Sequence, residues 1–185
     1  MRYSQVFLLV CLLFADFFAQ AQTSISPRHA MNNAFVEWRG TTGHYSVNYE
    51  RLLLRGADNR ILVGGGGGFS AFTYGVSKWT TVPLRLSFAV GYRQFYGELG
   101  FDYLFVHENY KSWRLGSRWD RYSFARYGLR YQALKKGLFV RAYVFPITVD
   151  ATKDAYLYHL GYNYRELKKT KKRVWWGGVG VGCSF

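Results

Sequence analysis

Hydrophobic and polar residues alternate along short segments over most of the chain that follows its first 30 residues. The C-terminus shows the pattern most clearly, because the odd positions Val179, Val181 and Cys183 are apolar and positions 178, 180 and 182 are glycine. One face of this segment is therefore bulky and the other is small. Such period-two alternation is typical of a barrel strand with lipid on one side and a crowded lumen on the other.

The same alternation predicts eight strands. Their approximate ranges are 33–39, 45–53, 60–69, 83–91, 95–105, 125–132, 138–147 and 175–185. Short alternating segments separated by turn residues, in an even number, are typical of outer-membrane barrels. The predicted fold is all-β: an eight-stranded antiparallel up-and-down transmembrane β-barrel.

The predicted connections differ in length on the two ends of this barrel. Three are short, at 55–59, 92–94 and 135–137, and three are longer, at 71–81, 106–120 and 148–173. Short periplasmic turns and long external loops are how such barrels are built, which predicts periplasmic termini. Residues 155–164 form either an external hairpin arm or an additional strand; the arm keeps the strand number even.

The N-terminal segment has the features of a secretory signal. Arg2 is followed by an apolar run at 6–14 and by Ala19-Gln20-Ala21, which fits an A-x-A cleavage site. We expect residues 1–21 to be a cleaved Sec-type signal peptide, 22–32 a short periplasmic segment and 33–185 the barrel. Cys183 is the one cysteine outside this signal, so no disulfide framework is expected.

Composition and charge narrow the possible partners. Aromatic residues make up 20% of the chain, and Tyr and Trp concentrate where barrels meet the bilayer surfaces. The formal net charge is +14, which is compatible with nucleic-acid binding in a protein that stays inside the cell. Predicted export argues against nucleic acid and favours anionic lipid headgroups, or a solvated basic loop without a partner.

The alternation also places eight charged side chains on the lumen face. They are Glu37, Glu50, Arg85, Glu98, Asp102, Arg126, Arg130 and Arg141. An eight-stranded barrel is filled by side chains, and buried charges of opposite sign should pair. We predict an ion-pair network that closes the lumen. A network that rearranges to form a narrow passive pore is the alternative.

Other candidate sites are few. A basic cluster in the last predicted external connection could bind lipopolysaccharide phosphates, at about 1 kcal/mol per basic residue. It consists of Lys168, Lys169, Lys171, Lys172 and Arg173.

No histidine pair has metal-site spacing, and the glycine run at 64–68 lacks the Lys-Ser/Thr of a phosphate loop, so neither metal nor cofactor is expected. His44, Ser46 and Glu50 leave a lipid-modifying outer-membrane enzyme as a further alternative, although a coincidental grouping explains them better.

Several segments carry a family resemblance. They are YSVNYER at 45–51, VPLRL at 82–86, GELG at 97–100, GLRY at 128–131, GLFVR at 137–141 and WGGVGVG at 176–182. In order and spacing the chain resembles small outer-membrane β-barrel proteins of the Bacteroidetes type, which are similar to OmpX-type eight-stranded barrels. Cys183 departs from the family pattern.

The resemblance implies a location and a fold, and it implies no activity. The terminal Phe185 matches the aromatic end of the signal that the barrel-assembly machinery reads. We therefore expect a monomeric protein of the Gram-negative outer membrane, with a structural or surface-interaction role and no catalytic residues. Its expected partners are outer-membrane lipids, including lipopolysaccharide, and the barrel-assembly machinery.

Overall fold

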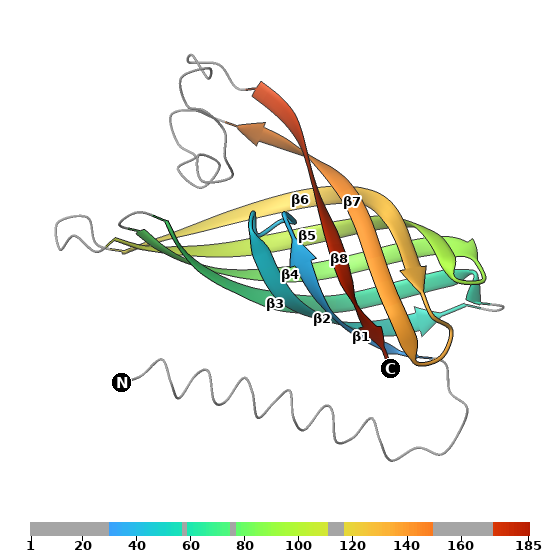
Figure 1. Cartoon of the computed structure of the whole chain (residues 1–185). Helices are drawn as coiled ribbons and strands as arrows, with labels where there is room; N and C mark the ends of the chain where they lie inside the picture. Colours follow the sequence, from blue (N-terminus) through green and yellow to red (C-terminus); the bar gives the residue numbers. More distant parts are fainter. Residues whose placement is uncertain (1–29, 57–58, 75–76, 111–116, 150–171) are drawn as a thin grey trace.

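The chain forms a closed barrel of eight antiparallel strands in a computed structural model (Figure 1). The structure describes residues 30–56, 59–74, 77–110, 117–149 and 172–185. The strands are β1 (Asn32–Trp38), β2 (Tyr45–Arg55), β3 (Ile61–Tyr74), β4 (Ser77–Tyr92), β5 (Phe95–Tyr110), β6 (Ser117–Gln132), β7 (Gly137–Val149) and β8 (Lys172–Ser184). Within these ranges no helix is long and apolar enough to cross a membrane.

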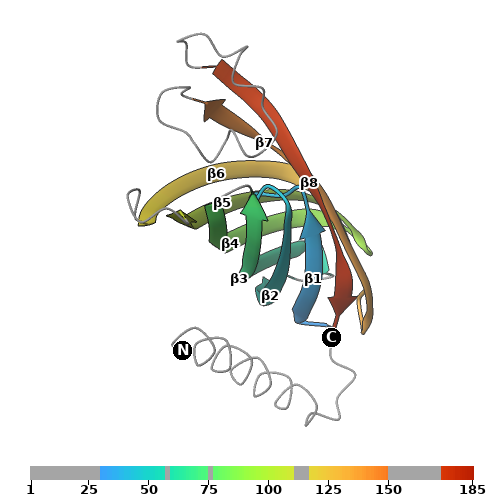
Figure 2. The ribbon, with the colours of Figure 1, turned by 60° about the vertical axis from the view of Figure 1, so that its left-hand side comes forward.

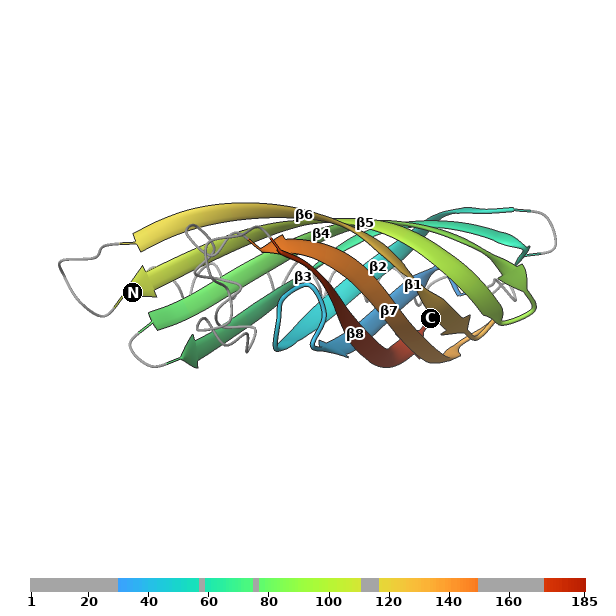
Figure 3. The same ribbon diagram turned by 90° about the horizontal axis from the view of Figure 1, so that it is seen from above.

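Each strand pairs with its neighbour in sequence, and β1 pairs with β8 to close the barrel. The pairing of the two ends continues one residue beyond β8. The amide of Phe185 donates to the carbonyl oxygen of Asn32 at 2.9 Å, and the amide of Asn32 donates to the carbonyl oxygen of Phe185 at 3.0 Å. Seen from above, the strands cross the barrel with a common tilt (Figure 3). The predicted eight-stranded antiparallel up-and-down barrel is confirmed.

The outer wall carries an apolar belt. On β5 the outward side chains run from Phe95 to Phe105, and on β4 from Tyr92 to Val82. Bulky apolar side chains exposed on the wall include Val36, Val47, Leu84, Leu86, Phe88, Leu99, Phe101, Leu129 and Val181. A stretch of eleven residues rises about 25 Å at about 3.4 Å per residue and a tilt near 45°, which matches the apolar band of transmembrane barrels.

Two of the predicted loops are wrong. Residues 71–81 and 106–120 are mostly strand, because β3 and β4 stay paired to Tyr74 and Ser77, and β5 and β6 stay paired to Asn109 and Ser117. Beyond the belt the outward residues become polar, while the inward residues Trp79, Val106 and Phe124 are apolar and buried. Along β4, β5 and β6 the alternation therefore reverses its sense, which is why outward-facing apolar residues do not reveal these segments.

We call the end of the barrel with the connections β1–β2, β3–β4, β5–β6 and β7–β8 the loop end, and the opposite end the turn end. The strands rise to unequal heights at the loop end. β1 ends at Trp38, and the pairing of β6 with β7 ends where Tyr127 lies opposite Val144. Above this point β3 to β6 continue as one sheet, and β7 and β8 continue as a separate two-stranded ribbon (Figure 2). Aromatic side chains join the two parts; the rings of Phe124 and Phe145, for example, are 5.1 Å apart.

Candidate functional site

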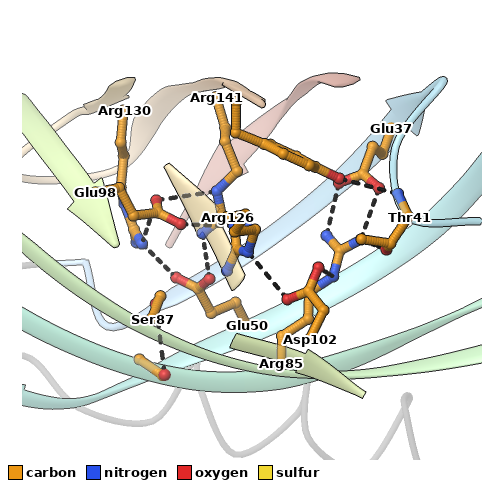
Figure 4. A network of polar contacts seen from close by, with 12 residues as sticks. Glu37, Thr41, Glu50, Arg85, Ser87, Glu98, Asp102, Arg126, Arg130 and Arg141 are labelled. Atoms are coloured by element: carbon orange, nitrogen blue, oxygen red, sulfur yellow. Dashed lines mark hydrogen bonds and ion pairs between the residues drawn. The ribbon is translucent and has the colours of Figure 1, made fainter. Parts of the chain in front are cut away.

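All eight charged residues that the alternation assigned to the lumen lie inside the barrel, and every one is buried. The strand pleat explains their direction, because alternate residues of a strand point to the same face. Glu37 comes from β1, Glu50 from β2, Arg85 from β4, Glu98 and Asp102 from β5, Arg126 and Arg130 from β6, and Arg141 from β7. Figure 4 shows these side chains turned toward one another.

The loop-side half of the network is built around Arg85 and Asp102. Both carboxylate oxygens of Glu37 accept a hydrogen bond of 2.6 Å from the Arg85 guanidinium, which also donates to Thr41 Oγ1 at 3.2 Å. Asp102 accepts from Arg126 Nε at 2.9 Å and lies 3.7 Å from Arg85 Nε. Asp102 thereby links the bidentate Glu37–Arg85 pair, the strongest arrangement of such groups, to the rest of the network.

The turn-side half is built around Glu98 and Glu50. Glu98 accepts from Arg126 at 2.6 Å and from Arg141 at 3.0 Å, and it lies 3.6 Å from Arg130. Glu50 forms ion pairs with Arg130, at 2.6 Å, and with Arg141. Four carboxylates and four guanidinium groups thus form one connected, formally neutral network across the lumen.

Aromatic rings support the arginines, a feature that sequence reasoning missed. The Arg141 guanidinium carbon lies 5.1 Å from the centre of the Phe35 ring and 5.3 Å from that of Phe139. Arg130 lies 5.1 Å from Phe139, and Arg126 lies 5.3 Å from Tyr143. Such cation–π contacts are worth about 0.5–2 kcal/mol each. The signal was present in the sequence, because these rings share the strand parity of the inward-facing arginines.

Glycine supplies the space that the network occupies. A Cβ atom added to Gly64 would lie 2.9 Å from Glu50 Oε1 and 2.8 Å from Ser87 Oγ. A Cβ added to Gly100 would lie 2.6 Å from Arg126 Cζ and 2.7 Å from its terminal nitrogen. These separations are too short for real contacts, so the glycines of the inner face allow large ionic side chains to fill a narrow barrel.

We expect Gly100→Ala to destabilise the barrel by about 1–3 kcal/mol, because the added methyl group displaces Arg126 from both of its carboxylate partners. Gly97→Ala on the same strand is the matched control, since its Cβ would point outward with its nearest neighbour, Val90 O, at 3.8 Å. Urea unfolding in lipid vesicles measures both. Equal unfolding midpoints for the two variants would contradict the packing argument.

Apolar layers lie on both sides of the network within the barrel. On the turn side the layer is formed by Leu52, Leu62, Ala89 and Tyr96. On the loop side it is formed by Trp79, Leu104, Val106, Phe124, Tyr143, Phe145 and Ile147. The charged layer therefore lies between two mainly apolar ones, where unpaired ions are costly.

The structure describes only some of the other residues that the sequence singled out. Lys168, Lys169 and Lys171 lie outside the described residues, as do residues 1–29 and 155–164. Lys172 begins β8, and Arg173 follows it with an exposed side chain. Phe185 takes part in barrel closure through its backbone.

The possible hydrolase set is not assembled. Glu50 is engaged by Arg130 and Arg141, and the ring of His44 lies 4.4 Å from that of Phe72. Ser46 Oγ accepts from Asn48 Nδ2 at 2.8 Å. Among the described residues, no group of three or more histidine, cysteine or acidic side chains could hold a metal ion.

The fold and the site define a class: a closed eight-stranded antiparallel β-barrel with an apolar outer belt and an ionic interior. It is similar to the N-terminal β-barrel domain of Pseudomonas aeruginosa OprF. The two are 13% identical with a TM-score of 0.44, and the match covers 86% of this chain and 100% of that chain. The likeness is one of fold. No protein-family model and no curated protein matches the sequence.

Proposed function

We propose that this protein is an outer-membrane β-barrel with a structural or surface-interaction role, whose lumen is closed by the ion-pair network. The observation that carries the proposal is the distribution of side chains across the wall. Leu84, Leu86 and Phe101 are each about half exposed on the outside, while Arg130 and Arg141 are buried inside. Such a distribution is costly in water and favourable when lipid surrounds the wall.

The composition of the lumen supports closure. Four acids and four bases cancel one another, and apolar layers lie above and below them. An ion that passed through would need these buried pairs to separate, at a cost of several kcal/mol. This arrangement favours a plugged barrel over a narrow passive pore.

The distribution of charge supports a role at an anionic surface. Because the lumen network is neutral, the whole formal charge of +14 belongs to the rest of the chain. Exposed bases at the loop end include Arg118, Arg121 and Arg173. We propose that this end contacts phosphorylated lipids, including lipopolysaccharide, and that Phe185 contributes to recognition by the barrel-assembly machinery.

The test combines location with conductance. The full chain is expressed in a Gram-negative host, recovered from the outer-membrane fraction and inserted into a planar bilayer. We expect enrichment in that fraction and no single-channel steps, because ion pairs and apolar layers fill the lumen. A 16-stranded porin in the same bilayer is the positive control. Recovery from the soluble periplasm would overturn the membrane assignment, and regular conductance steps would replace the plugged barrel with the pore.

A further inference from the structure

An apolar groove of about 450 Å³ crosses the outer wall where β6, β7, β8 and β1 lie side by side. Its floor is made by small residues, Ala142 on β7 and Gly177 on β8, at positions whose side chains would point outward. Tyr127 and Leu129 form one side of the groove, and Trp38 forms the other. The volume is within the range of small-molecule sites, and the floor lies at the height of the apolar belt.

A single cation lies at the loop end of this groove. Arg39, the residue after β1, lines the groove, is exposed and has a φ of 57°. Its guanidinium carbon lies 5.6 Å from the ring centre of Trp38 and 5.2 Å from that of Trp176. Trp176 Nε1 also donates to the Arg39 carbonyl oxygen at 2.6 Å, which fixes the backbone at this point.

Arg39 differs from the lumen arginines in its charged neighbours. Among the residues that the structure describes, no carboxylate forms an ion pair with it, whereas all four lumen arginines are paired. The two indole rings lie within cation–π distance of the guanidinium group. A planar fork of N–H donors matches the oxygens of a phosphate.

We propose that the groove and Arg39 together bind one anionic phospholipid, with an acyl chain over Ala142 and Gly177 and the phosphate on Arg39. This inference rests on the proposed membrane location. In a bilayer an open groove in the wall fills with an acyl chain, and Arg39 stands at the end of the groove toward the membrane surface. An anionic lipid is favoured because the charge outside the lumen is strongly positive.

The experiment compares two brominated lipids that differ in headgroup charge. The full-length barrel is reconstituted in dioleoyl phosphatidylcholine vesicles containing increasing fractions of dibrominated phosphatidylglycerol or dibrominated phosphatidylcholine. Bromine quenches nearby indoles, and Trp38 and Trp176 flank Arg39. We expect a roughly fivefold preference for phosphatidylglycerol, which corresponds to one guanidinium near an anionic surface.

Two pairs of variants separate the charge from the groove. Arg39→Gln should abolish the preference, while Arg60→Gln, which removes an exposed base at the turn end, should preserve it. Ala142→Phe should fill the groove and reduce quenching by both lipids. Ala125→Phe, at an exposed alanine of β6 that does not line the groove, should leave quenching near the wild-type level.

The outcomes separate this inference from the proposed function. A barrel that does not insert into vesicles overturns the membrane proposal. One that inserts but shows no preference, or keeps it in Arg39→Gln, overturns the lipid site. Inorganic phosphate is added in a parallel series, and displacement of the preference at millimolar concentration would indicate a free-anion site instead. Native mass spectrometry reports association, and a dimer that Ala142→Phe dissociates would assign the groove to a second copy.

Discussion

Replacing Glu98 with glutamine should destabilise the barrel by about 3–5 kcal/mol, because it leaves one uncompensated positive charge in the buried network. Glu98 is the centre of the turn-side half of the network, where it pairs with Arg126 and Arg141 and lies 3.6 Å from Arg130. Glutamine keeps the size and shape of the side chain, so the loss measures charge. Urea unfolding in vesicles, followed by tryptophan fluorescence, gives the free energy.

Asp120→Asn is the control for this variant. Asp120 pairs with Arg118 at 2.8 Å, but the Arg118 side chain is 54% exposed, and surface pairs contribute about 0–1 kcal/mol. Adding Arg126→Gln to Glu98→Gln restores neutrality and should recover part of the lost stability. If Glu98→Gln costs no more than Asp120→Asn, the network does not hold the barrel together.

The strands and the inward direction of the lumen charges could be predicted because both follow from the alternation within each segment. Arg126 and Arg130 lie four residues apart on β6, so the pleat points both to the same face. The same holds for Glu98 and Asp102 on β5. Which acid pairs with which base could not be predicted. Arg141 reaches Glu50, 91 residues away, and that contact depends on how the closed barrel staggers its strands.

The upper parts of the strands were missed for a different reason. Trp79, Val106 and Phe124 continue the inward parity of charged residues such as Arg85, Asp102 and Arg126, but they are apolar. In the belt the inward residues are charged and the outward ones are apolar. Above it, on β4, β5 and β6, most inward residues are apolar, with Glu108 as a buried acid among them, and most outward residues are polar. A single rule of apolar outside and polar inside therefore cuts β3, β4, β5 and β6 short at the loop end.

The groove could not be found from one strand at a time. Ala142 and Gly177 are unremarkable in their own segments, where small residues are frequent. They form a floor because β7 and β8 pair with Val144 opposite Gly177 and Ala142 opposite Val179. Arg39 joins them because β1 closes the barrel against β8. The register in which these strands pair is not encoded in the local alternation of any one segment.

Arginine introduced at Leu99 should destabilise the inserted barrel by about 2–4 kcal/mol, the cost of a cation on the lipid face near the middle of a bilayer. Leu99 is 49% exposed on the outer wall of β5, close to the centre of the apolar stretch from Phe95 to Phe105. Unfolding by urea in vesicles of phosphatidylcholine measures the difference from the wild-type barrel.

Asn109→Arg supplies the matched comparison, because Asn109 is also exposed on the outward face of β5 but lies beyond the belt. There the new charge stays in water, and the expected change is within about 0.5 kcal/mol. The two substitutions add the same side chain to the same face of the same strand, so only the surroundings of the wall differ. A penalty at Leu99 as small as that at Asn109 would mean that water, not lipid, surrounds the belt.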